Sequence, residues 1–351
     1  MTGRTQRVVV DGESSSEAPV KSGAPQGTVL GPLFFILYIN DINADTTSSI
    51  RLFADDCLLY RVINTVSDAD MLQRDLQQLG KWADIWQMDF NAAKCHLLSV
   101  TRKKNPVKYT YSIGGAPLKQ VAHHPYLGVE LAADLSWGEH IKNVVPRAQR
   151  TLNFLRRNLS GCSQGTKEAA YKTLVRPLLE YGSSAWDPYQ GNHIGKLEDV
   201  QRRAARFVKG QYRRDVSVTK LQEELQWRTL QERRLCARLT MFHKATNGEE
   251  VLTLPPTAPP STGDNRTSHD LQFTQPRART ETYIYSYFPR TIRIWNILPA
   301  SVVYAPNADI FKSRLHEQFT GKRMYTVTPR GLFDRPRLGS YGCVTAIGPV
   351  Y

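Results

Sequence analysis

Residues 50–60 read IRLFADDCLLY, and the pattern within them predicts a β-hairpin. Apolar residues alternate along 50–54, a β-prone run follows at 57–60, and Asp55 and Asp56 stand at the expected turn. Two adjacent ionised carboxylates repel each other unless cations neutralise them. Mg²⁺ suits such a pair, because it is usually held by one or two carboxylates together with substrate phosphates. An isolated Asp-Asp pair is more often a solvated acidic turn, and both interpretations are open on this evidence.

The residues before the hairpin favour the metal interpretation. Residues 22–27 read SGAPQG, and Gly23, Pro25 and Gly27 predict a tight, rigid turn in which a ligand can approach the backbone. Apolar residues at helical spacing then predict a buried helix: Leu30, Leu33, Phe34, Leu37 and Tyr38. Residues 22–32, the YIND of 38–41 and the FADD of 53–56 together resemble the palm of a reverse transcriptase. More narrowly, they are similar to the polymerase of a non-LTR, LINE-type or jockey-like retrotransposon.

The resemblance runs over residues 4–320 and implies an α+β fold. It predicts a partial right-hand polymerase palm, an antiparallel sheet with helices, followed by an all-helical thumb. The expected division is a palm in residues 1–136, a basic thumb in 137–247, a Pro-rich linker in 248–271 and a C-terminal tail region in 272–351. The family's fingers, its first palm strand and the catalytic Asp of that strand have no counterpart in residues 1–21. From residue 322 onward we find no organising pattern.

The resemblance also implies roles for individual residues. Asp55 and Asp56 would hold Mg²⁺ (or Mn²⁺) for nucleotidyl transfer, and Lys94 would lie near the triphosphate, although an ordinary solvated lysine is equally consistent with the sequence. The turn would contact the template and the incoming nucleotide through Ser22, Gly23, Pro25, Gln26 and Gly27. Residues 125–129 would form the primer grip, with Tyr126 and Gly128 against the primer, while a strand that simply packs is the alternative.

Positive charge is concentrated in the middle of the chain. The formal net charge is +14, and residues 137–244 hold 21 Lys and Arg against 10 Asp and Glu, whereas residues 1–136 hold 13 against 14. A helix near residues 194–209 would place its cations on one face, within about 120° at 100° per residue. These cations, Arg202, Arg203, Arg206 and Lys209, are expected to contact phosphates of nucleic acid. Arg228, Arg233, Arg234 and Arg238 repeat the same mixture beside apolar residues.

The remaining features restrict the function further. The five cysteines show no Cys-x-x-Cys spacing, which argues against a disulfide framework or a zinc site. The longest apolar run, residues 33–39, is too short to span a bilayer, so no membrane partner is expected. Asp11-Gly12 predicts a hairpin turn within residues 4–21, and Ser67 is the expected N-cap of a helix whose apolar stripe includes Leu72, Leu76 and Leu79.

Three functional interpretations follow. The first is an RNA-directed DNA polymerase fragment that uses an RNA template, a DNA primer and deoxynucleoside triphosphates, weakly active or inactive alone because of the absent carboxylate. The second is a non-catalytic nucleic-acid-binding remnant that uses the basic thumb. The third is an incomplete gene model. The resemblance implies action in the nucleus, and the short basic run 102–104 does not by itself indicate nuclear import.

Overall fold

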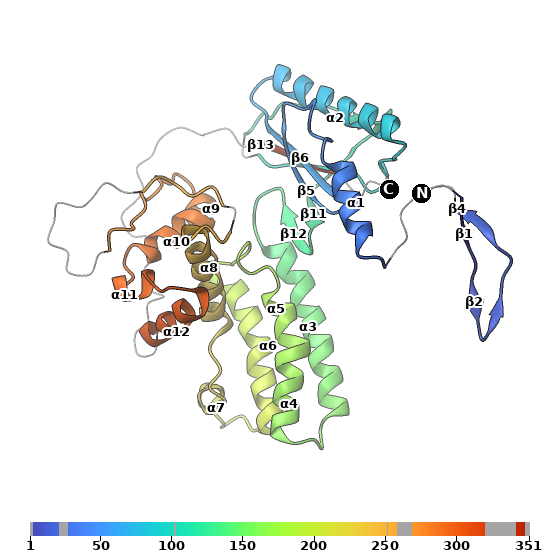
Figure 1. Cartoon of the computed structure of the whole chain (residues 1–351). Helices are drawn as coiled ribbons and strands as arrows, with labels where there is room; N and C mark the ends of the chain where they lie inside the picture. Colours follow the sequence, from blue (N-terminus) through green and yellow to red (C-terminus); the bar gives the residue numbers. More distant parts are fainter. Residues whose placement is uncertain are drawn as a thin grey trace. The chain divides into compact units, whose positions relative to one another are not determined.

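The computed structural model describes residues 3–20, 27–101, 103–250, 252–257, 269–319 and 342–347. The chain forms two compact units. Unit 1 contains residues 1–121 and 340–351, and unit 2 contains residues 122–339. Figure 1 shows both units and labels many of their helices and strands.

Unit 1 is built on a five-stranded sheet in the order β10-β7-β13-β6-β5. Its strands are β5 (Ser49–Phe53), β6 (Asp56–Val62), β7 (His96–Ser99), β10 (Lys119–Val121) and β13 (Gly342–Ile347). Strand β13 is antiparallel to both β6 and β7, so β6 and β7 run parallel to each other. The long helix α2 (Val66–Trp86) connects them, and its apolar stripe packs against Cys57, Leu59 and Leu97 of the sheet.

Strand β13 was not expected from the sequence, where residues beyond 322 showed no pattern. It pairs with β6 from Gly342↔Val62 to Ile347↔Cys57, and with β7 from Cys343↔Ser99 to Ala346↔His96. A strand in the middle of a sheet satisfies backbone groups on both of its sides and on both neighbouring strands. The middle strand of the unit 1 sheet is therefore formed by residues that lie far along the sequence from the other four strands.

The smaller elements of unit 1 surround this sheet. The predicted Asp11-Gly12 turn is confirmed: both residues have positive φ, 52° and 88°, and they connect two short antiparallel strands. The N-cap of α2 is Thr65 and not Ser67, because Thr65 and Asp68 form a reciprocal capping box. The other elements are β1 (Arg4–Gln6), β2 (Val9–Val10), β3 (Glu13–Ser14), β4 (Ala18–Val20), α1 (Leu30–Ile39), β8 (Ser112–Ile113) and β9 (Ala116–Pro117).

Unit 2 starts with a hairpin, β11 (His123–Tyr126) and β12 (Val129–Ala132), and the longer elements among its described residues are helices. Its first core is formed by α3 (Gly138–Asn158), α4 (Gln164–Ala170), α5 (Arg176–Glu180), α6 (Gly191–Lys209) and α7 (Val218–Glu224). Helix α3 continues through Pro146 without a break. A π-helical segment, Tyr171–Val175, lies just before Pro177, whose ring and missing N–H disrupt a regular helix.

A second core of unit 2 packs around α8 (Leu230–Thr246). It includes the fully buried Trp295 and Phe311 from the C-terminal helices. These helices are α9 (Glu281–Ile284), α10 (Tyr287–Trp295), α11 (Ala300–Val303) and α12 (Ala308–Phe319). Phe311 and Leu315 of α12 are both buried in this core.

An arginine cluster around Asp187 joins the loop after α5 to α8 and α10. Asp187 Oδ1 accepts a hydrogen bond from Arg234 Nε at 2.9 Å, and the same carboxylate pairs with Arg238 and with Arg290. Arg234 is fully buried and Arg238 is 3% exposed. Burial lowers the pKa of Arg290 to about 10, although the nearby Asp187 opposes that shift. These arginines therefore stabilise the interior of unit 2.

Candidate functional site

The two aspartates lie at a tight turn at one edge of the unit 1 sheet. Phe53 and Asp56 form the last pair of the β5–β6 hairpin, and only Ala54 and Asp55 lie between the strands. Ala54 has a φ of +49°, in the left-handed region that two-residue hairpin turns require. Both aspartates are half-buried. Asp55 is thus in the turn itself, and Asp56 is the first residue of β6.

The hairpin has one face against α2 and one face away from it. Cys57 and Leu59 are buried in the core beneath α2. Because successive side chains of a strand point to opposite faces, Asp56 lies on the other face, together with Leu58 and Tyr60. Burial raises the pKa of the Cys57 thiol to about 12, so this cysteine stays protonated and serves packing. The carboxylate of Asp56 is therefore kept out of the apolar core.

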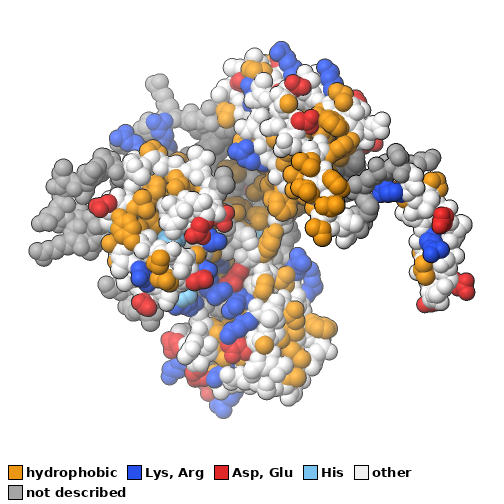
Figure 2. All heavy atoms as spheres, viewed as in Figure 1, with side chains coloured by type: hydrophobic (Ala, Val, Ile, Leu, Met, Phe, Trp, Pro, Cys, Tyr) orange, Lys and Arg blue, Asp and Glu red, His pale blue; other side chains and the backbone are white. Residues whose placement is uncertain are grey.

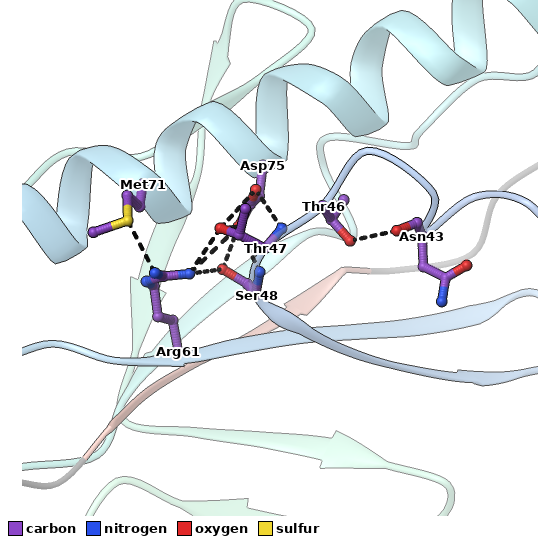
Figure 3. A network of polar contacts seen from close by, with 7 residues as sticks. All are labelled: Asn43, Thr46, Thr47, Ser48, Arg61, Met71 and Asp75. Atoms are coloured by element: carbon purple, nitrogen blue, oxygen red, sulfur yellow. Dashed lines mark hydrogen bonds and ion pairs between the residues drawn. The ribbon is translucent and has the colours of Figure 1, made fainter.

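A buried acid on α2 fixes the base of the hairpin. Asp75 accepts hydrogen bonds from the backbone N–H groups of Thr47 at 3.0 Å and Ser48 at 2.8 Å, immediately before β5 (Figure 3). Both hydroxyls donate to the same carboxylate, and Arg61 of β6 lies 3.8 Å from it. The role of Asp75 was not predicted from the sequence. The one sign of it there is an acidic residue beside the apolar stripe of α2, four residues before Leu79.

Lys94 lies at the same edge of the sheet as the aspartates. In the sheet register, Ala346 of β13 is opposite both Leu58 of β6 and His96 of β7. Asp56 and Lys94 each lie two residues earlier on their parallel segments. Strands β6 and β7 themselves are separated by two strand spacings of roughly 4.8 Å each. Lys94 itself ends a turn, in which its N–H donates to Asn91 O at 2.9 Å, and its side chain is exposed.

Of the Gly-Pro turn, only Gly27 can be described; Ser22, Gly23, Pro25 and Gln26 lie outside the described residues. Gly27 has a φ of +80°, which agrees with the tight turn that its sequence predicts. The following helix, α1, forms as predicted, but only Ile39 within it is buried. Leu33, Ile36 and Leu37 are at least half exposed, and Figure 2 shows hydrophobic side chains gathered over this part of unit 1.

The candidate primer grip is a tight hairpin turn in unit 2. Leu127 and Gly128, with φ of 47° and 77°, connect β11 and β12. A Cβ on Gly128 would lie 2.9 Å from Cε1 of Tyr181, and the Tyr181 hydroxyl donates to Leu127 O at 3.2 Å. The group that approaches Gly128 closely is thus an aromatic ring of the same unit. Tyr126 is the last residue of β11 and is half-buried.

The four cations of α6 differ in what they contact. Arg202 pairs with Asp199, and Lys209 Nζ lies 2.6 Å from Glu224. Arg206 Nη1 donates to Arg213 O at 2.8 Å and also reaches Val216 O. Arg203 is exposed. Three of the four thus already have acceptors within unit 2.

The sequence suggests that α8, like α6, exposes arginines beside its apolar residues. The structure shows that this prediction is wrong for the arginines of α8. Arg234 and Arg238 are buried against Asp187, and Arg233 makes a two-bond pair with Glu180. Helical periodicity identified an arginine-rich face, but it could not show that an acid from a distant loop would cover that face. These arginines are structural.

The donor set at the aspartate turn fits a hard divalent cation. Carboxylate oxygens are the ligands that Mg²⁺ and Mn²⁺ prefer, and half-buried positions leave room for water and phosphate oxygens. Across the part of the chain that the structure describes, no group of three or more His, Cys, Asp or Glu residues is arranged to hold a metal ion. The protein ligands that the turn offers to a metal ion are therefore the carboxylates of Asp55 and Asp56.

Among the described residues, none of the helices combines the length and the apolar composition that a membrane span needs.

The sequence of this chain is similar to those of known reverse transcriptases. Residues 3–131 match the family described as reverse transcriptase (RNA-dependent DNA polymerase). The chain is 28% identical over 244 residues to the RNA-directed DNA polymerase from mobile element jockey of Drosophila melanogaster, covering 64% of this chain and 26% of that protein. It is 29% identical over 219 residues to a Drosophila melanogaster protein named "Probable RNA-directed DNA polymerase from transposon X-element", covering 60% of this chain and 24% of that protein.

A more distant relative comes from another insect. The Pol polyprotein of the type-1 retrotransposable element R1 2 of Nasonia vitripennis is 25% identical over 177 residues, with 47% of this chain and 43% of that protein covered. The chain spans about a quarter of the length of the two Drosophila relatives. The turn with Asp55 and Asp56, and the turn with Lys94, both lie within the matched segment. Residues 3–131 match the reverse transcriptase domain, and about 60% of the chain is similar to RNA-directed DNA polymerases of the jockey and X-element retrotransposons.

Proposed function

We propose that this chain is part of an RNA-directed DNA polymerase in which Asp55 and Asp56 hold the catalytic metal and unit 2 holds the nucleic acid. The observation that supports the proposal is that the β5–β6 turn and the turn before β7 lie at the same end of two parallel strands of the sheet. Asp55 and Asp56 occupy the β5–β6 turn, and the turn that ends in Lys94 opens β7 at the same edge. This edge lies inside the segment that matches the reverse transcriptase family.

The chemistry proposed for this edge is nucleotidyl transfer. A primer 3′-hydroxyl attacks the α-phosphate of a deoxynucleoside triphosphate, and pyrophosphate leaves. Mg²⁺ or Mn²⁺, when bound, neutralises the negative charge that develops on the phosphates. Asp55 and Asp56 contribute oxygen ligands, and the ammonium group of Lys94 stabilises or protonates the departing pyrophosphate. The hydrogen bonds from Thr47 and Ser48 to Asp75 keep the hairpin in place on α2.

We further propose that the chain alone is a weak polymerase or an inactive one. Two-metal sites for phosphoryl transfer use carboxylates on both sides of ions that lie about 3.5–4 Å apart. The aspartate turn provides one adjacent pair, and no larger acidic group with metal-binding geometry occurs among the described residues. Two carboxylates bind a divalent ion loosely, so both ion occupancy and turnover should be low.

The first test separates metal binding from synthesis. Mn²⁺ binding is measured by electron paramagnetic resonance on the full chain and on the Asp55→Asn/Asp56→Asn variant. We expect weak binding that the variant loses. Asp84→Asn, an exposed acid on α2, is the matched control and should bind as the unaltered chain does. Equal Mn²⁺ binding by the double variant would contradict the assignment of the metal ligands.

The second test is primer extension on an RNA template, with the full chain beside Asp55→Ala. We expect incorporation close to background from both proteins. Robust synthesis that Asp55→Ala abolishes would contradict weak activity and would support the catalytic role of Asp55. Robust synthesis that Asp55→Ala leaves intact would contradict that role.

The second candidate function is non-catalytic nucleic-acid binding. It is favoured by the excess of 11 positive charges in residues 137–244. It predicts duplex binding that survives Asp55→Ala and weakens steeply with salt, together with no nucleotide incorporation at any Mg²⁺ or Mn²⁺ concentration.

A further inference from the structure

Three arginines in the interior of unit 2 share one carboxylate. Asp187 accepts a hydrogen bond from Arg234 Nε at 2.9 Å and also pairs with Arg238. Arg290 Nη1 lies 3.0 Å from the same carboxylate. Among the residues that the structure describes, Asp187 is the one acid within ion-pair distance of these arginines. Guanidinium groups remain protonated at neutral pH, so the cluster sets three positive charges against one negative charge.

The next acid, Glu198 of α6, does not balance this charge. It acts electrostatically on Arg234, but no ion pair joins the two side chains. Burial raises the pKa of Glu198, and its Oε1 accepts the N–H of Gln231 at 2.9 Å. Even a fully ionised Glu198 would leave three positive charges against two negative ones. An excess of buried charge is costly unless a counter-ion pairs with it.

The same arginines carry buried N–H groups that have no acceptor. Arg234 is fully buried, and Arg238 is 3% exposed. Within the described parts of the chain, Arg234 Nη1 and Nη2 and Arg238 Nε have no hydrogen-bond partner. The two Nη atoms carry two N–H groups each, and Nε carries one. Protein interiors pair nearly all such groups, so these donors indicate a ligand that the chain does not supply.

The unpaired donors lie close together. Arg234 and Arg238 are one turn apart on α8 and therefore lie on the same face of that helix. They bind opposite oxygens of the Asp187 carboxylate. The Trp186 ring centroid is 6.0 Å from Arg234 Cζ, so an apolar ring borders the same position. Arg290 connects the cluster to solvent, since its side chain is 17% exposed.

The chemistry of the donors selects the kind of ligand. A water molecule could accept some of these N–H groups, but it would leave the excess positive charge in place. A carboxylate or phosphate would supply charge, but it must give up a large hydration shell to reach nitrogens that are shielded from solvent. A halide ion is a single atom, carries one negative charge and accepts several N–H groups at once.

We propose that unit 2 binds a small inorganic anion, of the size of chloride, between Arg234 and Arg238 beside Asp187. The anion accepts the N–H groups of Arg234 Nη1 and Nη2 and of Arg238 Nε, and it neutralises charge that Asp187 leaves over. It links α8 to the loop that carries Trp186 and Asp187, so its role is to stabilise unit 2. This inference does not depend on the proposed polymerase function.

The first experiment compares thermal unfolding of the full chain in sodium chloride and in sodium gluconate, at an equal ionic strength of about 0.15 M. Tryptophan fluorescence follows the transition. Gluconate screens charge as chloride does, but it is a bulky organic anion that cannot occupy a site for a single atom. Arg234→Met removes the unpaired donors and keeps an apolar stem. Arg203→Met removes the same charge from an exposed position on α6 and is the matched control.

The unaltered chain should unfold on the order of 3 °C higher in chloride than in gluconate, because a ligand that binds only the folded state raises the unfolding midpoint. Arg203→Met should keep this difference, and Arg234→Met should lose it. Equal midpoints of the unaltered chain in the two salts would overturn the inference. A difference that Arg234→Met retains would overturn it as well. Both outcomes leave the polymerase proposal standing.

Bromide gives a measurement that needs no variant, and it decides the question if Arg234→Met does not fold. Crystals of the full chain in sodium bromide are measured at the bromine absorption edge. We expect an anomalous peak in contact with Arg234 Nη1 or Nη2, beside Asp187. Ordered water at these nitrogens without an anomalous peak would overturn the inference, and so would bromide bound only to exposed lysines and arginines.

Discussion

The ring of Tyr181 occupies the space that a side chain on Gly128 would need. A Cβ on Gly128 would lie 2.9 Å from Tyr181 Cε1, and the φ of Gly128 is +77°. We expect Gly128→Ala to lower the free energy of unfolding of unit 2 by about 2 kcal/mol, from left-handed strain and displacement of the ring. Chemical denaturation followed by circular dichroism measures the change.

A double-mutant cycle separates these two causes. In a Tyr181→Ala background, Gly128→Ala should cost only the left-handed strain of about 1 kcal/mol. Gly195→Ala on α6, where nothing lies within 4 Å of the added carbon, should be neutral or stabilising. An equal loss from Gly128→Ala in both backgrounds would show that the tyrosine ring does not contribute.

Asp187 is the shared counter-ion of Arg234, Arg238 and Arg290, and its removal should be strongly destabilising. Asp187→Asn would leave buried guanidinium groups without a negative partner, and we expect a loss of about 3–5 kcal/mol in the free energy of unfolding. Asp199→Asn, which breaks the exposed pair with Arg202, should change stability by less than about 0.5 kcal/mol. Similar unfolding midpoints for the two variants would refute the structural role of the arginine cluster.

His140 makes the stability of unit 2 depend on pH. Burial lowers its pKa from 6.5 to about 4, and its Nδ1 accepts the N–H of Glu130 at 3.2 Å, so the folded state keeps the ring neutral. The unfolded chain binds a proton at this histidine below about pH 6.5. This contribution to stability is therefore fully present above pH 6.5 and is lost as the pH falls toward 4. It amounts to on the order of 3 kcal/mol.

The measurement for His140 is the difference in unfolding free energy between the unaltered chain and His140→Gln at pH 4.5, 5.5 and 7. The difference between the two proteins is used because it cancels the pH-dependent contributions that both share. The advantage of the histidine over glutamine should grow with pH and then level off above pH 6.5. A constant difference across the series would contradict a neutral buried His140.

Asp75 should hold the β5–β6 hairpin, which carries Asp55 and Asp56, in a fixed position. Asp75→Ala removes the acceptor for the N–H groups of Thr47 and Ser48 and leaves Arg61 without its acid, so we expect unit 1 to lose about 2–4 kcal/mol. Hydrogen exchange in residues 47–62 should become faster. Asp84→Asn, exposed on the same helix, should leave exchange unchanged. Full protection of these residues in Asp75→Ala would contradict the anchoring role.

Local patterns in the sequence were enough for the elements that depend on neighbouring residues. The alternation around Asp55 and Asp56 predicted the hairpin, and the stripe with Leu72, Leu76 and Leu79 predicted the buried face of α2. The start of α2 was misplaced by two residues, because the sequence offers both Ser67 and Thr65 as caps. Each has an acid three residues later, and the capping box forms between Thr65 and Asp68. The other acid, Asp70, accepts a hydrogen bond from the hydroxyl of Tyr109 instead.

Features that depend on contacts between distant residues could not be predicted from local sequence patterns. Periodicity on α8 could not reveal that Asp187, 47 residues before Arg234, would bury its arginines. Strand β13 carries no alternating pattern strong enough to stand out, and it forms because β6 and β7 both offer it backbone partners. Asp75 lies on the edge of an apolar stripe, where its chemistry depends on a loop that precedes it by 27 residues.

The position of β13 sets the order in which the protein can mature during translation. Strands β6 and β7 leave the ribosome early, but the strand between them follows only after residues 122–339 have been made. At about 5–20 residues per second, the gap lasts on the order of ten to forty seconds. During that interval each of the two strands has an unpaired edge open to chaperones or to other nascent chains. Unit 2 can finish folding first, and the sheet near the N-terminus is complete only after residues 342–347 have been made.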